Sequence, residues 1–306
     1  MEFECSLFDD RLGGMGVLFH SGLLDYFEIN GCCDEVRRCD SAHNASTDCA
    51  LSQRLVEQSM GATVSGNFGR GGAGSVSRRA AGPGKSDAIL NIFTRHVAEK
   101  GYDGTSFSDV ASELGISQGL IVHHYGTKAR LLDALHLAYM RRRIDEAERI
   151  ISEFPTPTEQ LAGLLHAAIL YQVHDRNRTV AFQREVARFA QQDENSEGRK
   201  LRRQYIGILH SLLDAGTAAG EFRPVDASIR SLLIFGSAQW AWTWFEPEGR
   251  RSAAQVGAEL VDLTLGSLLV NRKSLPRLSD PGGELVATVI KIITAAEITP
   301  KEAPDR

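Results

Sequence analysis

Residues 105–128 read TSFSDVASELGISQGLIVHHYGTK and contain the start and stop signals of two short helices. Ser106 can cap the first helix, with Asp109 three residues later as a variant capping box. Gly115 ends that helix, because glycine readily adopts the backbone conformation that closes a helical turn. A second helix of barely two turns follows, from Gln118 to His124. The stretch therefore predicts two short helices joined by a tight turn, the geometry of a helix-turn-helix.

The second of these helices is too short to be stable alone, so a neighbouring scaffold must present its polar side chains. Presentation in the major groove of DNA is a natural use of such a helix. The alternative is an ordinary antiparallel helix pair within an all-helical core.

Residues 85–140 resemble the DNA-binding domain of the TetR family of bacterial transcriptional regulators. The matching motifs, in chain order, are Gly101-Tyr102, Thr105-Ser106, Leu114-Gly115-Ile116-Ser117, His123-His124-Tyr125, Thr127-Lys128 and Leu131-Leu132. The chain departs from the family at Val122, where Tyr or a similar donor is most frequent, and at Leu120, where Ser or Thr is frequent. At these two positions we expect base contacts to be apolar, for example to a thymine methyl, or absent.

The resemblance implies an all-α protein with an N-terminal three-helix helix-turn-helix domain and a C-terminal helical domain that binds a ligand and dimerises. We expect a disordered extension at 1–84, the DNA-binding domain at 85–135, the ligand-binding and dimerisation domain at 136–271, and a C-terminal tail at 272–306. Met60 and Val76 are alternative start sites, and we expect the first 75 or so residues to be dispensable.

Helical patterns recur after the helix-turn-helix, without a strand pattern between them. They are expected at Thr127 to Phe154, Glu159 to His174, Thr179 to Gln191, Gly198 to Gly220, Asp226 to Phe245, Ser252 to Val270 and Glu284 to Ala296. Proline and glycine mark the breaks. By resemblance, Asp226 to Phe245 and Ser252 to Val270 pair with the same helices of a second subunit.

The candidate DNA contacts lie within the helix-turn-helix. They are Thr105, Ser106, Gln118, Gly119, Leu120, Val122, His123, His124 and Lys128. Gln118 can bond adenine N6 and N7 together, and His123 is a second polar base reader. Family matching puts Thr105, Ser106, His124 and Lys128 on phosphates, and Lys128 also begins a helix, where backbone amides favour an anion.

The candidate ligand pocket is assembled from apolar positions of the C-terminal domain. They are Leu165, Ile169, Phe182, Phe189, Tyr205, Leu209, Phe235 and Trp240. At helical spacing, filling a core is the favoured interpretation of any one of them, and lining a cavity is the alternative. Arg184, Arg188, Arg199, Arg202 and Arg203 are interpreted as solvated surface, with an anion site as the alternative.

The segment from Phe235 to Leu268 is similar to regulators of lipid and steroid breakdown in actinobacteria, some of which respond to acyl-coenzyme A thioesters. This weaker resemblance implies a small hydrophobic or acyl-type effector, such as a lipid, steroid or acyl-CoA.

The composition, with 42% hydrophobic and 24% charged residues among 306, is that of a globular protein. The net charge of −5 arises from acids concentrated in residues 1–60, so the remainder is near neutral, which suits a DNA binder whose positive charge is local. The longest apolar run, Leu232 to Trp242, is shorter than the ~20 residues of a membrane span. We therefore expect a cytoplasmic protein without a membrane contact.

All five cysteines lie in the first 49 residues, and none forms a Cys-x-x-Cys pair. Gly69 to Gly74 matches a dinucleotide fingerprint by letters, but no strand precedes it and no helix follows. No recognisable Ser/His/Asp or Cys/His motif is present. We expect no enzymatic activity, no cofactor, no metal and no disulfide.

Together these features predict a homodimeric repressor that a ligand releases from a palindromic operator in double-stranded DNA. The alternative functions are an activator, or a helix-turn-helix protein that acts through protein contacts only.

Overall fold

The computed structural model describes residues 84–190, 193 and 196–295. The expected extension at 1–84, apart from Gly84, lies outside this part of the chain, as do the cysteines and the glycine-rich fingerprint. Every element in the described residues is a helix, apart from one isolated antiparallel bridge between Phe222 and Leu269. The all-α prediction is confirmed.

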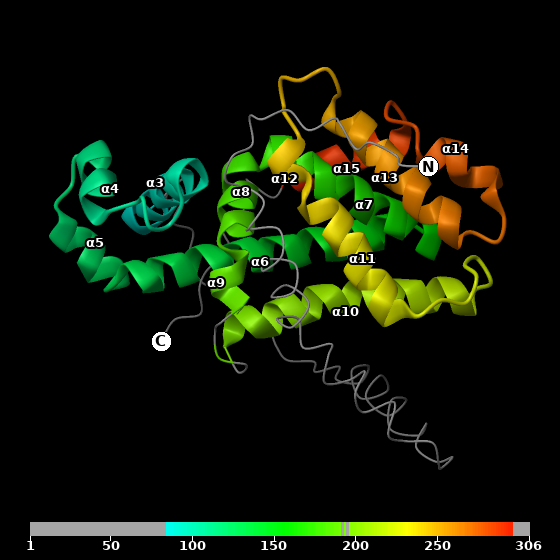
Figure 1. Cartoon of the computed structure of the whole chain (residues 1–306), viewed down its shortest axis with the longest axis horizontal. Coiled ribbons are helices and arrows are strands. Elements are labelled where there is room, and N and C mark those ends of the chain that lie inside the picture. Colours follow the sequence, from blue (N-terminus) through cyan, green and yellow to red (C-terminus); the bar gives the residue numbers. More distant parts are fainter. Residues whose placement is uncertain (1–83, 191–192, 194–195, 296–306) are drawn as a thin grey trace, which may run out of the picture.

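The first helices that follow Gly84 lie together at one end of the molecule (Figure 1), and we call them the N-terminal unit. They are α3 (Lys85–Lys100), α4 (Phe107–Leu114) and α5 (Gln118–Tyr125). The long helix α6 (Lys128–Glu153) runs from this unit into the rest of the molecule, which we call the body.

The helices of the body follow one another with short connections. They are α7 (Pro157–His174), α8 (Arg176–Arg184), α9 (Val186–Ala190), α10 (Glu197–Ala218), α11 (Ala227–Gln239), α12 (Ala241–Trp244), α13 (Ala253–Leu268), η2 (Arg272–Ser274), α14 (Leu275–Leu278) and α15 (Glu284–Ala295).

The helix boundaries in the N-terminal unit arise from local sequence. The Ser106 side chain accepts the Asp109 backbone N–H, and the Asp109 carboxylate accepts the Ser106 N–H, so the predicted capping box is present. Gly115 closes α4 in the left-handed conformation, with φ of 62°, which glycine adopts without steric cost. The side chains of Ser117 and Thr127 likewise accept the backbone N–H groups of Leu120 and Arg130, and so cap the starts of α5 and α6.

The N-terminal unit does not build its core alone. Phe93 and Ile121 are fully buried within it, but the same cluster includes Leu131 from α6, Phe182 from α8 and Phe189 from α9. Helix α8 packs along α3. The predicted boundary at residue 135 is therefore not a packing boundary, because the body supplies part of the core of the N-terminal unit.

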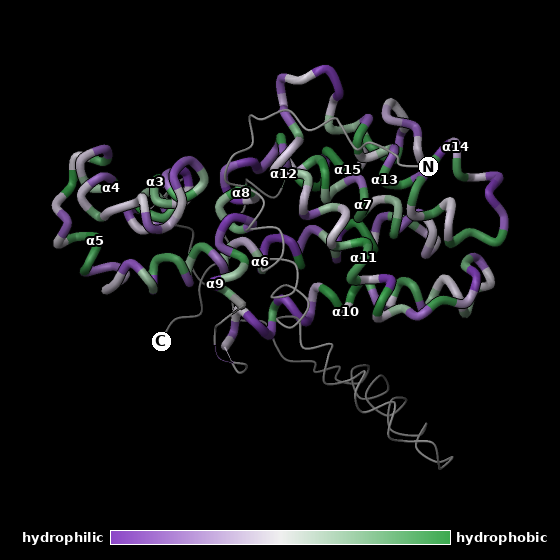
Figure 2. The backbone as a smooth tube through the Cα atoms, viewed as in Figure 1, coloured by the Kyte–Doolittle hydropathy of each residue, from purple (hydrophilic) through white to green (hydrophobic). Residues whose placement is uncertain are grey.

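Helix α7 is the centre of the body. It packs along α13 and α15, and Figure 2 shows hydrophobic residues gathered on these helices. Residues 272–306 were expected to form a tail, yet α15 buries Leu285, Val289 and Ile293 in the main core. The described part of this segment belongs to the body, because its apolar face covers α7.

Two of the expected helices are broken. The helix expected from Thr179 to Gln191 divides into α8 and α9 at Glu185, whose carboxylate accepts a hydrogen bond from the Tyr102 backbone instead of facing solvent. The helix expected from Asp226 to Phe245 divides at Trp240 into α11 and α12. Both breaks lie where one continuous pattern was predicted.

Candidate functional site

Helix α5 presents its polar side chains outward. Gln118, Gly119, His123 and His124 are exposed, and Val122 is 49% exposed, whereas Ile121 is fully buried beneath them. Leu120 is half-buried. The structure thus brings the candidate base readers together on one accessible helical surface.

The three candidate phosphate contacts at the helix starts differ in their availability. Ser106 is exposed. Lys128 is half-buried, with Nζ 4.2 Å from the centroid of the Tyr102 ring. Thr105 is only 1% exposed, and its hydroxyl donates to the Gly101 carbonyl at 2.9 Å. The expected phosphate contact from the Thr105 side chain is therefore corrected, because that hydroxyl is used inside the N-terminal unit.

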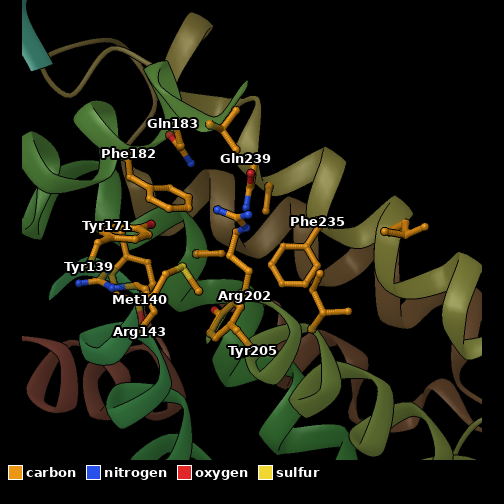
Figure 3. Close-up of a pocket in the computed structure, with 15 residues that line it drawn as sticks. Tyr139, Met140, Arg143, Tyr171, Phe182, Gln183, Arg202, Tyr205, Phe235 and Gln239 are labelled. Carbon is orange, nitrogen blue, oxygen red and sulfur yellow. The ribbon is translucent and has the colours of Figure 1, made fainter. Parts of the chain in front are cut away.

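A cavity of about 70 Å³ lies where α6, α7, α8, α10 and α11 converge. Figure 3 shows aromatic rings around it together with the polar ends of several longer side chains. The labelled lining residues are Tyr139, Met140, Arg143, Tyr171, Phe182, Gln183, Arg202, Tyr205, Phe235 and Gln239. The wall is thus mainly apolar, with a few polar groups that can orient a ligand.

The sequence predicted part of this wall. Phe182, Tyr205 and Phe235 line the cavity. Leu165 and Leu209 instead line a neighbouring cavity of about 30 Å³, which also touches Tyr205 and Phe235. Five of the eight candidates therefore lie at one or the other cavity.

The remaining three candidates are corrected. Ile169 is 1% exposed and fills the core of the body. Phe189 is equally buried and stacks on His136, with ring centroids 4.1 Å apart. Trp240 is 49% exposed at the end of α11. Helical periodicity could not distinguish these positions, because core and cavity residues share the same face.

Arg143 is a cavity residue that the sequence did not suggest. It is 2% exposed, its guanidinium lies 3.6 Å from the centroid of the Tyr171 ring, and Nη2 donates to Asp175 Oδ2 at 2.6 Å. The sequence feature that could have indicated this role is the spacing, because Arg143 follows Tyr139 by four residues and so lies on the same face of the helix.

Burial and charge act together at this wall. Burial disfavours the Arg143 charge, but Tyr171 and Glu146 nearby raise the pKa of the guanidinium above its ordinary value. Burial also raises the pKa of Tyr139 to about 12. At neutral pH the wall therefore presents a cationic guanidinium beside neutral phenols, an arrangement that favours an oxygen acceptor on a ligand.

Arg202 is a second buried guanidinium in the wall, at 8% exposure. Nη1 lies 3.0 Å from His136 Nε2, which must accept, and Nη2 donates to the Phe189 carbonyl at 2.8 Å. The interpretation of Arg202 as solvated surface is corrected. Arg184 has another role, since it donates to the Ala98 carbonyl of α3 at 2.9 Å and so ties α8 to the N-terminal unit.

An apolar face runs along α11 and α13. Ile229 is 52% exposed, Leu233 is 54% exposed and Leu263 is 69% exposed. Leu260, on the same helix as Leu263, is 8% exposed and packs inward. We call Ile229, Leu233 and Leu263 the α11/α13 face.

Within the described residues, no three His, Cys, Asp or Glu side chains come together in a way that could hold a metal ion. None of the helices there is both long enough and apolar enough to cross a membrane.

Comparisons with known proteins identify two matching families. Residues 94–135 match the family described as bacterial regulatory proteins, tetR family. Residues 155–268 match the family described as tetracyclin repressor-like, C-terminal domain.

Individual relatives cover the same region. The HTH-type transcriptional repressor KstR2 of Mycobacterium tuberculosis is 26% identical over 181 residues, which is 59% of this chain and 90% of KstR2. The structure of this KstR2, a ketosteroid transcriptional regulator, superposes with a TM-score of 0.56 over 63% of this chain and 100% of that chain.

Two solved complexes share the fold. AibR, crystallised with isovaleryl coenzyme A and operator DNA, has a TM-score of 0.52 at 24% identity, over 59% of this chain and 97% of AibR. FadR from Bacillus subtilis, crystallised with stearoyl-CoA, has a TM-score of 0.51 at 24% identity, over 60% of this chain and 99% of FadR.

Proposed function

Because this chain belongs to the TetR family of transcriptional regulators, we propose that it is a repressor whose operator affinity falls when an acyl-type or other small hydrophobic molecule enters the cavity. The observation that carries this proposal is a shared wall. Tyr139, Met140 and Phe182 line the cavity and also belong to the core of the N-terminal unit. A ligand that displaces these side chains must disturb the packing beneath α3, and so favour one orientation of the unit over another.

The size of the cavity supports such a change of shape. At about 70 Å³ it is about half the roughly 150 Å³ that holds benzene in a cavity of another protein. An acyl chain is larger than benzene, so its binding requires the surrounding helices to separate. The conformation in this structure, with its small cavity, is then the ligand-free one, and we assign it to the form that binds DNA.

The chemistry of the wall supports an acyl-type ligand. Aromatic rings provide apolar contact, and Arg143 and Arg202 provide buried donors for a carbonyl or carboxylate oxygen. Acyl-CoA thioesters combine both features, and AibR and FadR were each crystallised with a ligand of this class.

The accessible surface of α5 supports operator binding. Two copies joined through the α11/α13 face would place two such helices on one side of a duplex, about one helical turn apart, and so require a palindromic site. We propose that residues 85–135 carry the DNA contacts and that the body, including α14 and α15, carries ligand binding and dimerisation.

The experiment begins with a duplex selected by the protein from random DNA. Binding to this duplex is measured with isovaleryl-CoA, stearoyl-CoA or free coenzyme A present. We expect at least one acyl-CoA to lower the affinity and free coenzyme A to have little effect. Binding of DNA without any response would contradict the ligand class. Failure to select a duplex, or affinity that is independent of salt, would favour the alternative of protein contacts only.

A further inference from the structure

We infer that Glu185 is the positioning residue that transmits displacements of the cavity wall to the turn between α3 and α4, an inference that rests on the proposed function. Glu185 lies at the break between α8 and α9 and is 7% exposed. Its Oε1 accepts the Tyr102 backbone N–H at 2.8 Å. Its Oε2 accepts from Arg188 Nε at 2.8 Å.

The neighbours of Glu185 face the cavity. Phe182, Gln183 and Val186 all line it. The Glu185 N–H bonds the Phe182 carbonyl three residues back, at 3.3 Å, so the regular helical ladder is interrupted here. Movement of these wall residues therefore moves the Glu185 carboxylate directly, without having to bend a continuous helix.

The receiving end is the segment that sets the position of α4. Gly101 closes α3 with φ of 76°, and Tyr102 follows it immediately. Ser106, four residues further on, caps α4. The hydrogen bond from the Tyr102 N–H to the Glu185 carboxylate therefore connects the backbone of this turn to the body. Because its acceptor is charged, this bond is stronger than one between neutral groups.

The ring of Tyr102 is also in contact with two cationic side chains. Lys128 Nζ, at the start of α6, lies 4.2 Å from the ring centroid. The Arg188 guanidinium lies 4.9 Å from the same centroid, and Arg188 forms an ion pair with Asp103. The body and α6 thus meet at Tyr102, and Glu185 is the buried member of this contact.

The first test uses the full chain without DNA or acyl-CoA. Ala168→Leu or Ile206→Phe places extra volume in the cavity, since both residues line it. Hydrogen exchange of residues 101–106 then reports on the turn. We expect either filling variant to change the exchange rate there by at least about threefold. No change would overturn the inference, because the cavity and the turn would then be independent.

The second step asks whether Glu185 carries the effect. With Glu185→Ala, the filling variants should no longer alter exchange at 101–106. With Glu185→Gln the effect should persist, because the amide oxygen still accepts the Tyr102 N–H. The matched control is Glu197→Ala, which removes an exposed carboxylate of the body that pairs with Arg141. An undiminished response in Glu185→Ala would overturn the assignment.

A third variant keeps the test decisive if Glu185→Ala fails to fold. Arg188→Met leaves Glu185 in place but removes one partner of its carboxylate, and should reduce the response by about twofold. An unchanged response would overturn the inference. Since none of these measurements uses DNA or acyl-CoA, failure of the proposed regulation would appear separately, as wild-type protein whose operator binding ignores the ligand.

Discussion

Arg143 and Asp175 form an ion pair, with Nη2 and Oδ2 2.6 Å apart, that is almost fully buried where α6, α7 and α8 meet. The other Asp175 oxygen accepts from Arg178 at 3.0 Å, and Arg178 in turn donates to Asn91 of α3 at 3.0 Å. Asp175 also stands at the junction of α7 and α8. One carboxylate therefore connects the cavity wall to the N-terminal unit.

We expect Asp175→Ala to reduce the free energy of unfolding by about 3–5 kcal/mol, because it leaves the Arg143 charge buried without this partner. The matched control is Asp145→Ala, which removes an exposed pair with Arg149 on the same helix as Arg143. That control should reduce the free energy of unfolding by less than about 1 kcal/mol. Chemical denaturation measures both, and equal losses would contradict the prediction.

His166 should make the protein less stable in mild acid. Its Nε2 donates to the Leu278 carbonyl at 2.9 Å, while Nδ1 is buried without a partner, and burial lowers the pKa of the ring. Because the folded pKa lies below the unfolded value of about 6.5, stability should be complete above that pH and fall as the pH drops below it. Chemical denaturation gives the free energy of unfolding at pH 8 and at pH 5.5. The difference between these two values should be smaller for His166→Gln than for the wild type. The exposed control, His123→Gln, should show the same difference as the wild type.

Gly216 and Gly207, both on α10, should respond oppositely to alanine. A Cβ at Gly216 would lie 2.1 Å from the buried Phe222 ring, whereas a Cβ at Gly207 would have no neighbour within 4 Å. Gly216→Ala should therefore cost about 1–3 kcal/mol of overpacking. Gly207→Ala should stabilise by up to about 1 kcal/mol, because alanine is the better helix former. Thermal unfolding distinguishes them, and similar melting temperatures would be inconsistent with this packing.

Gln118 and Lys128 should differ in their effects on DNA. Gln118→Ala should cost about 1–3 kcal/mol on the selected duplex and little on random DNA, because it removes a base contact and leaves phosphate contacts intact. Lys128→Ala should weaken both and reduce the salt dependence. Titrations at several salt concentrations decide between them, and equal losses on the two DNAs for Gln118→Ala would exclude base readout.

The α11/α13 face should hold the dimer together. Leu233→Glu or Leu263→Glu should give monomers with poor operator affinity, because an obligate interface excludes unpaired charge. Val173→Glu is the control, since this valine of α7 is also exposed, at 44%. Leu260→Glu should unfold the protein instead, because Leu260 is buried. Sedimentation of the unmodified chain as a monomer at micromolar concentration would refute the interface.

The sequence predicted the N-terminal unit more completely than the body. The capping signals at Ser106 and Ser117 and the stop at Gly115 act within a few residues, so they determine α4 and α5 without reference to the rest of the chain. The break at Glu185 could not be read in this way. Its partner, Tyr102, is 83 residues away in sequence, and no local pattern encodes that hydrogen bond.

The cavity shows the same limit. Phe182 and Ile169 are both buried apolar residues of helices, yet only Phe182 lines the cavity. Whether an apolar side chain meets a void or another side chain depends on how five helices converge. Arg143 was missed for a related reason, since its burial is compensated by Asp175, which lies 32 residues away at the junction of α7 and α8.

The packing of α15 also determines the order in which the chain can fold during synthesis. The N-terminal unit has its last core residue, Phe189, long before Val289 and Ile293 complete the core of the body. At ribosomal rates of about 5–20 residues per second, this leaves an interval of about 5 to 20 s. During it α7 exposes the apolar face that α15 later covers. The body, rather than the N-terminal unit, is therefore the part of the nascent chain whose apolar surface stays exposed longest during synthesis.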